Sequence, residues 1–225
     1  MAFFSSQNQE IPTESNRTIL IIGGTGVLGK AFLSHRPQDV FIINVSRRGS
    51  IDGPMSHSIH EDILKDPEKL LRKMSVRVPM IDVLITMTYD HSFSSVKNLD
   101  RDTFLREIEL DTFLPIRLSV LCEEIFWSRC ERKTNIEMGR KVIHISSRAA
   151  FGKTVRPELA SYSGAKAALN IMTEYVHEHL FSAVGVSAHI IAPGSLKNIQ
   201  VTRATVEAIW KLERMRASQF TVEKI

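Results

Sequence analysis

Short runs of consecutive apolar residues alternate with longer amphipathic stretches along this chain. The short runs are rich in Ile and Val, and several are apolar at every position. That pattern is typical of strands that are buried on both faces of a parallel sheet. The runs predict strands over Thr18–Ile22, Val40–Val45, Ile81–Thr86, Lys141–Ser146 and Val186–Ala192, and a weaker one near Ser58–Glu61.

The amphipathic stretches between these runs have helical periodicity. They predict helices over Gly26–Ser34, Pro67–Ser75, Asp100–Arg129, Ser161–Phe181 and Thr202–Arg216. Strands and helices that alternate at these lengths form right-handed crossovers. We therefore expect the α/β class, with a single-domain Rossmann-type fold: a doubly wound parallel sheet of six strands, flanked by helices. Phe220–Val222 is expected to add a short or vestigial seventh strand.

Length and composition agree with one domain. A chain of 225 residues buries one sizeable core, and we expect a flexible lead-in over residues 1–16 before a domain over 17–225.

Cys122 and Cys130 are eight residues apart in one helical stretch, too far to pair with each other. The sequence shows no zinc spacing, no signal peptide and no run long enough to span a membrane. We expect a cytoplasmic protein without a metal site.

The net charge of +4 indicates an anionic partner. The basic residues are spread along the chain in short groups, and they do not alternate with aromatic residues that could stack on bases. An anionic small molecule is therefore favoured over nucleic acid or a membrane surface.

A glycine-rich turn connects the first predicted strand to the first predicted helix. Gly23 can form a tight turn, Gly26 can let a pyrophosphate approach the backbone, and Gly29 can let the helix pack on the strand. The helix N-terminus would offer free N–H groups to the phosphates. A turn without a ligand is the alternative. The predicted cofactor-binding residues here are Gly23, Thr25, Gly26, Val27, Leu28 and Gly29.

The residues at the tip of the second strand bear on which dinucleotide is bound. An acidic residue there binds the ribose 2′-hydroxyl of NAD, whereas arginine suits the 2′-phosphate of NADP. Arg47 and Arg48 occupy the tip, so NADP(H) is preferred over NAD(H). They could equally be solvated loop residues. Asp62, after the weak strand, is either beside the adenine or an ordinary helix cap.

Tyr162 and Lys166 form a candidate acid–base pair at the start of a predicted helix. Residues four apart share one helix face, and a nearby ammonium stabilises a phenolate and lowers the tyrosine pKa. The pair alone is a weak signal. However, Ser147 ends a buried strand fifteen residues before Tyr162, at the edge where open sheets bind ligands.

With these residues, the chain resembles the short-chain dehydrogenases/reductases. The resemblance runs from about Thr18 to Trp210 and includes the segments GGTGVLG, HISS, YSGAKAALN and the Pro193-Gly194 turn. It implies that Tyr162 is the general acid or base, that Lys166 holds the nicotinamide ribose and that Ser147 binds the substrate oxygen. It also implies that Pro193, Gly194 and Leu196 contact the cofactor.

Three positions depart from the family's pattern. Thr86–Tyr89 replaces an Asn-Asn-Ala-Gly stretch, so Tyr89 stands where a glycine is usual and either displaces the loop or stacks on a ligand. Asp111 stands where an asparagine contributes to a proton relay, and as an anion it cannot donate a hydrogen bond. Asn198 stands where a threonine commonly touches the carboxamide.

These observations predict an NADP(H)-dependent oxidoreductase that transfers hydride to or from a small-molecule carbonyl or alcohol, with Ser147, Tyr162, Lys166 and Asp111 as catalytic residues. An NADP(H)-binding sensor or scaffold of the same fold is the alternative, and sugar-nucleotide epimerisation ranks last. The resemblance also implies a homodimer or homotetramer. Met172 lies on the apolar helix face that would form the subunit interface.

Overall fold

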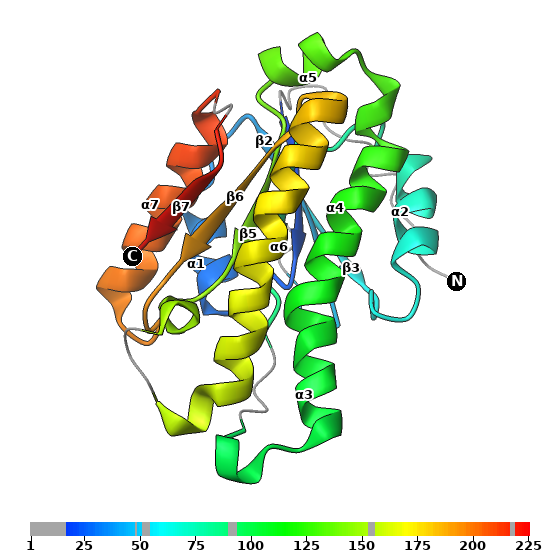
Figure 1. Cartoon of the computed structure of the whole chain (residues 1–225). Coiled ribbons are helices and arrows are strands. Elements are labelled where there is room, and N and C mark those ends of the chain that lie inside the picture. The colour runs from blue at the N-terminus through cyan, green and yellow to red at the C-terminus, as the bar shows by residue number, and fades with distance from the viewer. Residues whose placement is uncertain (1–16, 48, 51–54, 90–93, 153–155, 217–218) are drawn as a thin grey trace.

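The computed structural model describes residues 17–47, 49–50, 55–89, 94–152, 156–216 and 219–225. Within them, one parallel sheet has the strand order β3-β2-β1-β4-β5-β6-β7 (Figure 1). Its strands are β1 Arg17–Ile22, β2 Val40–Ser46, β3 Ser56–His60, β4 Val83–Thr86, β5 Lys141–Ile145, β6 Ser187–Ala192 and β7 Thr221–Lys224. The predicted α/β Rossmann-type sheet is confirmed. The predicted lead-in over residues 1–16 lies outside the described residues.

Helices cover both faces of the sheet (Figure 1). One face carries α1 (Val27–Ser34) and α7 (Ile199–Arg214), which pack on each other. The other carries α2 (Pro67–Ser75), α4 (Leu114–Ile125) and α6 (Ala160–Val184). The remaining pieces are α3 Arg101–Ile108, α5 Arg132–Glu137, the π-helical turn η2 Glu109–Phe113, and the 3₁₀ turns η1 Val96–Asn98, η3 Trp127–Arg129, η4 Arg148–Phe151 and η5 Pro157–Leu159.

The central strand β1 divides its side chains between two cores. Leu20 and Ile22 pack in the core beneath α2, α4 and α6, whereas Ile19 and Ile21 pack in the core beneath α1 and α7. All four are at most 2% exposed. Successive side chains of a strand point to opposite faces, so a strand buried on both faces is apolar at most positions in succession.

The stretch predicted as one helix over Asp100–Arg129 is interrupted in the structure. It forms α3, the π-helical turn η2, α4 and η3. Pro115 is the second residue of α4 and has no N–H to donate to the carbonyl of Asp111, and the N–H of Leu114 donates to the Glu109 carbonyl. The proline therefore explains the widened turn.

The predicted seventh strand is present as β7. It pairs in parallel with β6, from His189 opposite Thr221 to Ala192 opposite Lys224. None of the helices in the described part of the chain has both the length and the apolar character needed to cross a membrane.

Candidate active site

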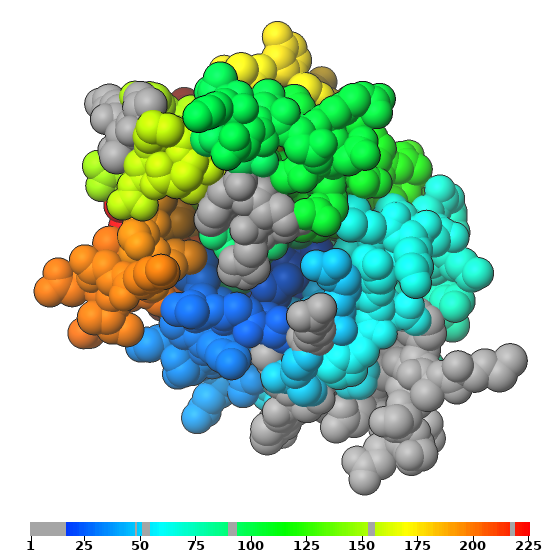
Figure 2. All heavy atoms as spheres, turned by 90° about the horizontal axis from the view of Figure 1, so that it is seen from below, coloured from blue at the N-terminus to red at the C-terminus, as the bar shows by residue number. Residues whose placement is uncertain are grey.

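The candidate site lies at the carboxyl edge of the sheet, where β1 and β4 are neighbours. The helix after β1 covers one face and the helices after β4 reach the other, so the connections diverge at this point. Open parallel sheets bind ligands at such a switch point. Figure 2 looks onto this edge, with the blue β1–α1 unit between the orange start of α7, the yellow-green segment after β5 and the green helices.

Three of the four glycines after β1, Gly23, Gly26 and Gly29, meet different surroundings. A Cβ on Gly23, whose φ is 85°, would lie 2.9 Å from the carbonyl oxygen of Met87, and one on Gly29 would lie 1.9 Å from that of Gly24. A Cβ on Gly26 would meet nothing within 4 Å. Gly23 and Gly29 are therefore required for packing, and Gly26 leaves open space at the N-terminus of α1.

Asn44 fixes the shape of the glycine turn from the neighbouring strand. It is fully buried in β2, and its Oδ1 accepts a hydrogen bond from the Gly24 N–H at 2.9 Å. Its Nδ2 donates to the Ser46 hydroxyl at 3.2 Å. Sequence reasoning missed this residue. Its signal was the single amide within an otherwise apolar strand, VFIINVS.

The structure describes two of the three residues predicted to bind the adenosine end of the cofactor, Arg47 and Asp62. Arg47 follows β2 directly and is exposed at this edge, whereas Arg48 lies outside the described residues. Asp62 follows β3, and its carbonyl accepts from the Lys65 N–H. The N-cap of α2 is Asp66. The reading of Asp62 as a helix cap is therefore wrong.

Ser147 and Tyr162 meet at the ends of different elements. Ser147 follows β5 and caps η4 by accepting from the Ala149 N–H at 3.2 Å, while Tyr162 lies in the first turn of α6. A hydrogen bond joins their side chains. The ring of Tyr89 meets that of Tyr162 edge-on, with 5.6 Å between centroids. The two hydroxyls predicted to hold and protonate a substrate oxygen are therefore adjacent.

Lys166 lies one helical turn after Tyr162 on α6 and is 1% exposed. Its Nζ donates to the carbonyl oxygens of Thr88 at 3.0 Å and Ile145 at 3.2 Å, and it forms an ion pair with Asp111 Oδ1 at 3.1 Å. An ammonium has three N–H donors, so these contacts occupy all of them. Lys166 thus ties together the ends of β4 and β5 and the turn η2.

The surroundings of Tyr162 raise its pKa well above the usual value. Burial is the main cause; the hydrogen bond with Ser147 opposes it, and the electrostatic effects of Asp111, Tyr89 and Glu107 add to it. The expectation that Lys166 lowers this pKa is therefore wrong for this structure. Lys166 pairs with Asp111, and burial disfavours the phenolate.

Solved structures share this architecture. A short chain dehydrogenase family protein from Francisella tularensis subsp. tularensis SCHU S4 matches with a TM-score of 0.76 and 14% identity, over 93% of this chain and 96% of that one. Thermoplasma acidophilum aldohexose dehydrogenase matches with a TM-score of 0.77 and 12% identity, over 94% and 92%. This chain has the short-chain dehydrogenase/reductase fold.

A third structure with the short-chain dehydrogenase/reductase fold was solved with bound NAD⁺. It is a short chain dehydrogenase from Leptospira borgpetersenii, with a TM-score of 0.76 and 16% identity, over 94% of this chain and 91% of that one. No protein-family model and no curated protein sequence matches the chain. The comparisons therefore establish the fold, and the chemistry must be argued from the residues.

Two further buried side chains, Glu107 and His144, lie near the candidate site of this short-chain dehydrogenase/reductase fold. Glu107 is fully buried in α3, one helical turn before Asp111. Sequence reasoning missed it, although its spacing of four residues from Asp111 was a signal. His144 of β5 bonds to Thr86 Oγ1 at 2.7 Å and to Ser119 Oγ at 3.3 Å. Burial, and then the charge of Lys166, lower the pKa of His144 to about 3, so it is neutral.

The turn after β6 completes this edge of the short-chain dehydrogenase/reductase fold. The Pro193 carbonyl accepts from the Arg148 N–H at 3.0 Å, and the Gly194 N–H donates to the Ile225 carbonyl at 2.7 Å. Leu196 is partly buried and packs against the core beneath α7. The side chain of Asn198 caps α7 by accepting from the Gln200 N–H. The turn is therefore anchored to η4 and to the residue after β7.

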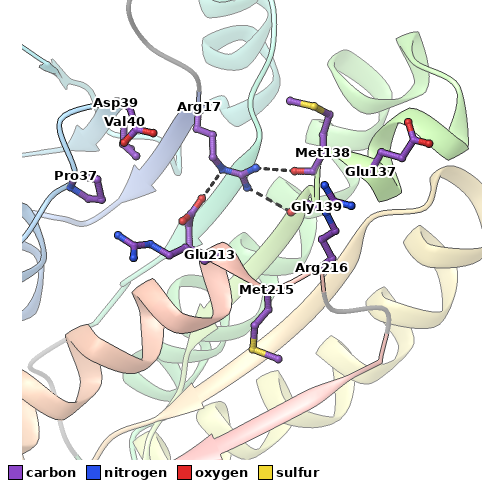
Figure 3. A pocket seen from close by; sticks show the side chains of 11 residues that line it. Arg17, Pro37, Asp39, Val40, Glu137, Met138, Gly139, Glu213, Met215 and Arg216 are labelled. Carbon is purple, nitrogen blue, oxygen red and sulfur yellow. Dashed lines mark hydrogen bonds and ion pairs between the residues drawn. The ribbon is translucent and has the colours of Figure 1, made fainter.

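A cavity of about 390 Å³ lies at the opposite, amino edge of the sheet (Figure 3). Arg17 forms an ion pair there with Glu213 and donates to the carbonyl oxygens of Met138 and Gly139. The dashed lines in Figure 3 mark these contacts of Arg17 with the Glu213 carboxylate and the two backbone carbonyls. The cavity lies away from Ser147, Tyr162 and Lys166, so it is separate from the candidate active site.

Proposed function

We propose that this protein is an NADP(H)-dependent oxidoreductase of the short-chain dehydrogenase/reductase type, acting on a small-molecule carbonyl or alcohol. The observation that carries the proposal is the closeness of Ser147 to Tyr162, which lies one helical turn before the buried Lys166 on α6. This pair lies at the switch point of the sheet, at the same edge as the glycine turn. Two adjacent hydroxyls at that place suit the binding and protonation of one oxygen atom.

The residues present fit a dinucleotide. The open space at Gly26 and the N-terminus of α1 would hold the pyrophosphate. Arg47 and Arg48 at the tip of β2 would bind a 2′-phosphate, and the tip residues carry no carboxylate that would repel it. Pro193, Gly194 and Leu196 border the same edge and would contact the nicotinamide end. Asp62 would lie on the adenosine side.

Ser147 and Tyr162 would have separate roles in binding the substrate oxygen and transferring its proton. A bound nicotinamide supplies or accepts the hydride. Ser147 would hold the substrate oxygen by a hydrogen bond, and Tyr162 Oη would donate a proton to that oxygen as the carbonyl carbon is reduced. In the reverse direction Tyr162 would take the proton from an alcohol. Lys166 would fix the floor of the site beneath both groups.

The test is cofactor binding and turnover by the full-length protein. NADPH fluorescence titration should show binding that is tighter than that of NADH. A panel of aldehydes and ketones should contain a substrate on which NADPH is consumed. Tyr162→Phe should lower that rate by at least about a hundredfold, the typical contribution of a general acid. Tyr175→Phe is the matched control, since Tyr175 is 70% exposed on the same helix. An unchanged rate in Tyr162→Phe would contradict the mechanism.

A cofactor-binding sensor or scaffold is the second candidate. It is favoured by the ion pair of Lys166 with Asp111 and by Tyr89, whose ring packs against that of Tyr162. Such a protein would bind NADPH in the titration and consume none across the carbonyl panel. The two functions are thus separated by the same pair of measurements.

We also propose a homodimer or homotetramer in the cytoplasm. The oligomer would form through α6, on which Ile171, Met172 and Tyr175 are each at least 42% exposed. Apolar groups that gather on one helix face are typical of subunit contacts. Cys122 and Cys130 are both free thiols, as in proteins of a reducing compartment.

A further inference from the structure

Two cations, Arg148 and Lys224, border the Pro193-Gly194 turn at the carboxyl edge of the sheet. Arg148 directly follows Ser147, and its N–H donates to the Pro193 carbonyl at 3.0 Å. Lys224 is the last residue of β7, the edge strand drawn in red in Figure 1, and is in register with the last residue of β6. Parallel strands end at the same edge, so both cations lie at the edge that carries Ser147.

The side chains of these two cations lie close to the same side of η4. Arg148 and Phe151 are the first and last residues of that 3₁₀ turn, and side chains three residues apart in such a turn eclipse each other. Lys224 Nζ is 4.0 Å from the centroid of the Phe151 ring. Arg148 Cδ is 3.6 Å from the position that a Cβ on Gly194 would take. Arg148 therefore runs along the glycine, while Lys224 lies over the neighbouring ring.

Neither cation is neutralised by a carboxylate in the part of the chain that the structure describes, where no ion pair includes Arg148 or Lys224. Glu223, next to Lys224, pairs with Lys211 of α7, because successive strand residues point to opposite faces. The contact with Phe151 positions Lys224 and leaves its charge in place. Two like charges on one side of a turn favour an anion between them.

We propose that Arg148 and Lys224 bind a carboxylate of the substrate, so that the protein acts on carbonyl or hydroxy compounds that carry a carboxylate. The inference rests on the proposed function and names its substrate class. Arg148 is next to Ser147, which would hold the reacting oxygen, so the carboxylate would lie beside the turn after β6. A guanidinium matches a carboxylate in geometry, and Lys224 adds a point charge. The two cations bind and orient the substrate, and no proton or hydride passes through them.

The phosphates of the cofactor would lie elsewhere on this edge. The pyrophosphate is proposed at Gly26 after β1, and the 2′-phosphate at Arg47 after β2. β4 and β5 lie between β1 and β6 in the sheet, which is about 14 Å at the usual strand spacing of about 4.8 Å. Arg148 and Lys224, at the ends of β5 and β7, are therefore left to the substrate.

The test compares 3- and 4-acetylbenzoate with their amides, 3- and 4-acetylbenzamide. Each pair shares the ketone, the ring and the size, and differs in one charge. Calorimetry gives the dissociation constants for the full-length protein with and without NADP⁺, where no reduction occurs. At least one benzoate should bind at least about tenfold more tightly than its amide, as expected of a charge-assisted hydrogen bond. This preference should shrink as the salt concentration rises, because both cations are exposed.

Two variants connect the preference to these side chains. Arg148→Met and Lys224→Met each remove one charge, and each should lower the preference for the benzoate at least about threefold. The double variant should abolish it and leave the affinity for NADP⁺ unchanged. Where the wild-type protein reduces a benzoate, Arg148→Met should raise KM and leave kcat nearly unchanged, since the charge acts equally on the ground state and the transition state.

Arg129→Met is the matched control. Arg129 is exposed in η3, which precedes β5 and so lies at the opposite, amino edge of the sheet, and it forms no ion pair with the described residues. The same change of arginine to methionine there should leave the preference for the benzoate as it is in the wild-type protein.

Equal binding of benzoates and amides by the wild-type protein would overturn the proposal, as would a preference that survives in the folded double variant. A loss of NADP⁺ affinity equal to the loss of benzoate affinity would overturn it too, because the cations would then bind the cofactor. Circular dichroism checks folding, and the single variants decide if the double variant unfolds. A protein that prefers a benzoate and reduces neither ketone would fail the proposed reaction and retain this binding site.

Discussion

Gly26 and Gly29 lie three residues apart and support the candidate site in different ways. An alanine at position 29 would place its Cβ 1.9 Å from the Gly24 carbonyl, whereas at position 26 it would meet open space. We expect Gly29→Ala to lower the free energy of unfolding by about 1–3 kcal/mol or to prevent folding. Gly26→Ala should leave stability nearly unchanged and weaken NADPH binding at least about tenfold, because its methyl group fills the space proposed for the pyrophosphate.

Urea unfolding and NADPH titration of the two variants measure both effects. The backbone of Gly26 is extended, with φ of −76°, so alanine adopts it without strain. Gly26→Ala serves as the stability control for Gly29→Ala. A Gly26→Ala protein that binds NADPH as tightly as the wild type would place the cofactor elsewhere.

Part of the candidate site could be predicted from the sequence. Tyr162, Ser147 and the glycines were found because each has a characteristic spacing next to a strand or helix end. The pairing of Lys166 with Asp111 could not be read in the same way, since the two are 55 residues apart and meet only through the packing of α6 on η2. Burial is the main reason why the expected lowering of the Tyr162 pKa was wrong, and the electrostatic effect of Asp111 adds to it.

At the scale of elements, β5, β6 and α6 hold buried histidines that the fold keeps neutral. Burial lowers the pKa of His177, and burial followed by the charge of Lys141 lowers that of His189 to about 3. His177 accepts from the Ala188 N–H through Nδ1, and His189 bonds to the Ser187 hydroxyl. The neutral His177 ring therefore joins α6 to β6, and the His189 bond lies within β6.

This arrangement predicts loss of stability in mild acid. The folded pKa of His144 and of His189 is about 3 and the usual value is 6.5, so below about pH 6.5 the unfolded chain binds protons that the native chain does not. The free energy of unfolding should fall as pH drops through this window, by up to about 1.4 kcal/mol per pH unit for each residue. Urea unfolding at a series of pH values measures the slope.

His189→Gln should reduce that slope, because it removes one of the groups. His179→Gln is the control, since His179 is on the surface and pairs with Glu123. Equal slopes in the wild-type and His189→Gln proteins would show that His189 does not remain neutral in the native state.

Most elements could be predicted, and the exceptions have physical causes. Strands buried on both faces carry runs of consecutive apolar residues, which made β1, β2 and β5 evident. The helix predicted over Asp100–Arg129 was wrong in its continuity, because Pro115 widens the preceding turn without disturbing the apolar periodicity. The half-buried β7 was predicted only as a short or vestigial strand, because it has few apolar residues.

At the scale of the whole molecule, both faces of the sheet are covered, and an apolar surface remains outside on α6. Ile171 is 61% exposed and Tyr175 is 70% exposed there. Ile171→Glu should shift the proposed dimer or tetramer towards monomer, since a carboxylate is costly to bury in an apolar interface. Light scattering coupled to size-exclusion chromatography measures the mass.

Val76→Glu is the matched control, because Val76 is 83% exposed at the end of α2. It should leave the assembly unchanged. A wild-type protein that is monomeric at all accessible concentrations would contradict the proposed oligomer. A mass that stays that of an oligomer in Ile171→Glu would place the interface on another surface.

The hydrogen bond from the Gly24 N–H to buried Asn44 bears on how a ligand would meet this edge of the sheet. The turn is held in its shape by the strand beside it, before any phosphate arrives. Binding a dinucleotide there would order little additional backbone, so little conformational entropy would be lost and most of the contact energy would appear as affinity. Association could then proceed at the rate of encounter, without waiting for the loop to rearrange.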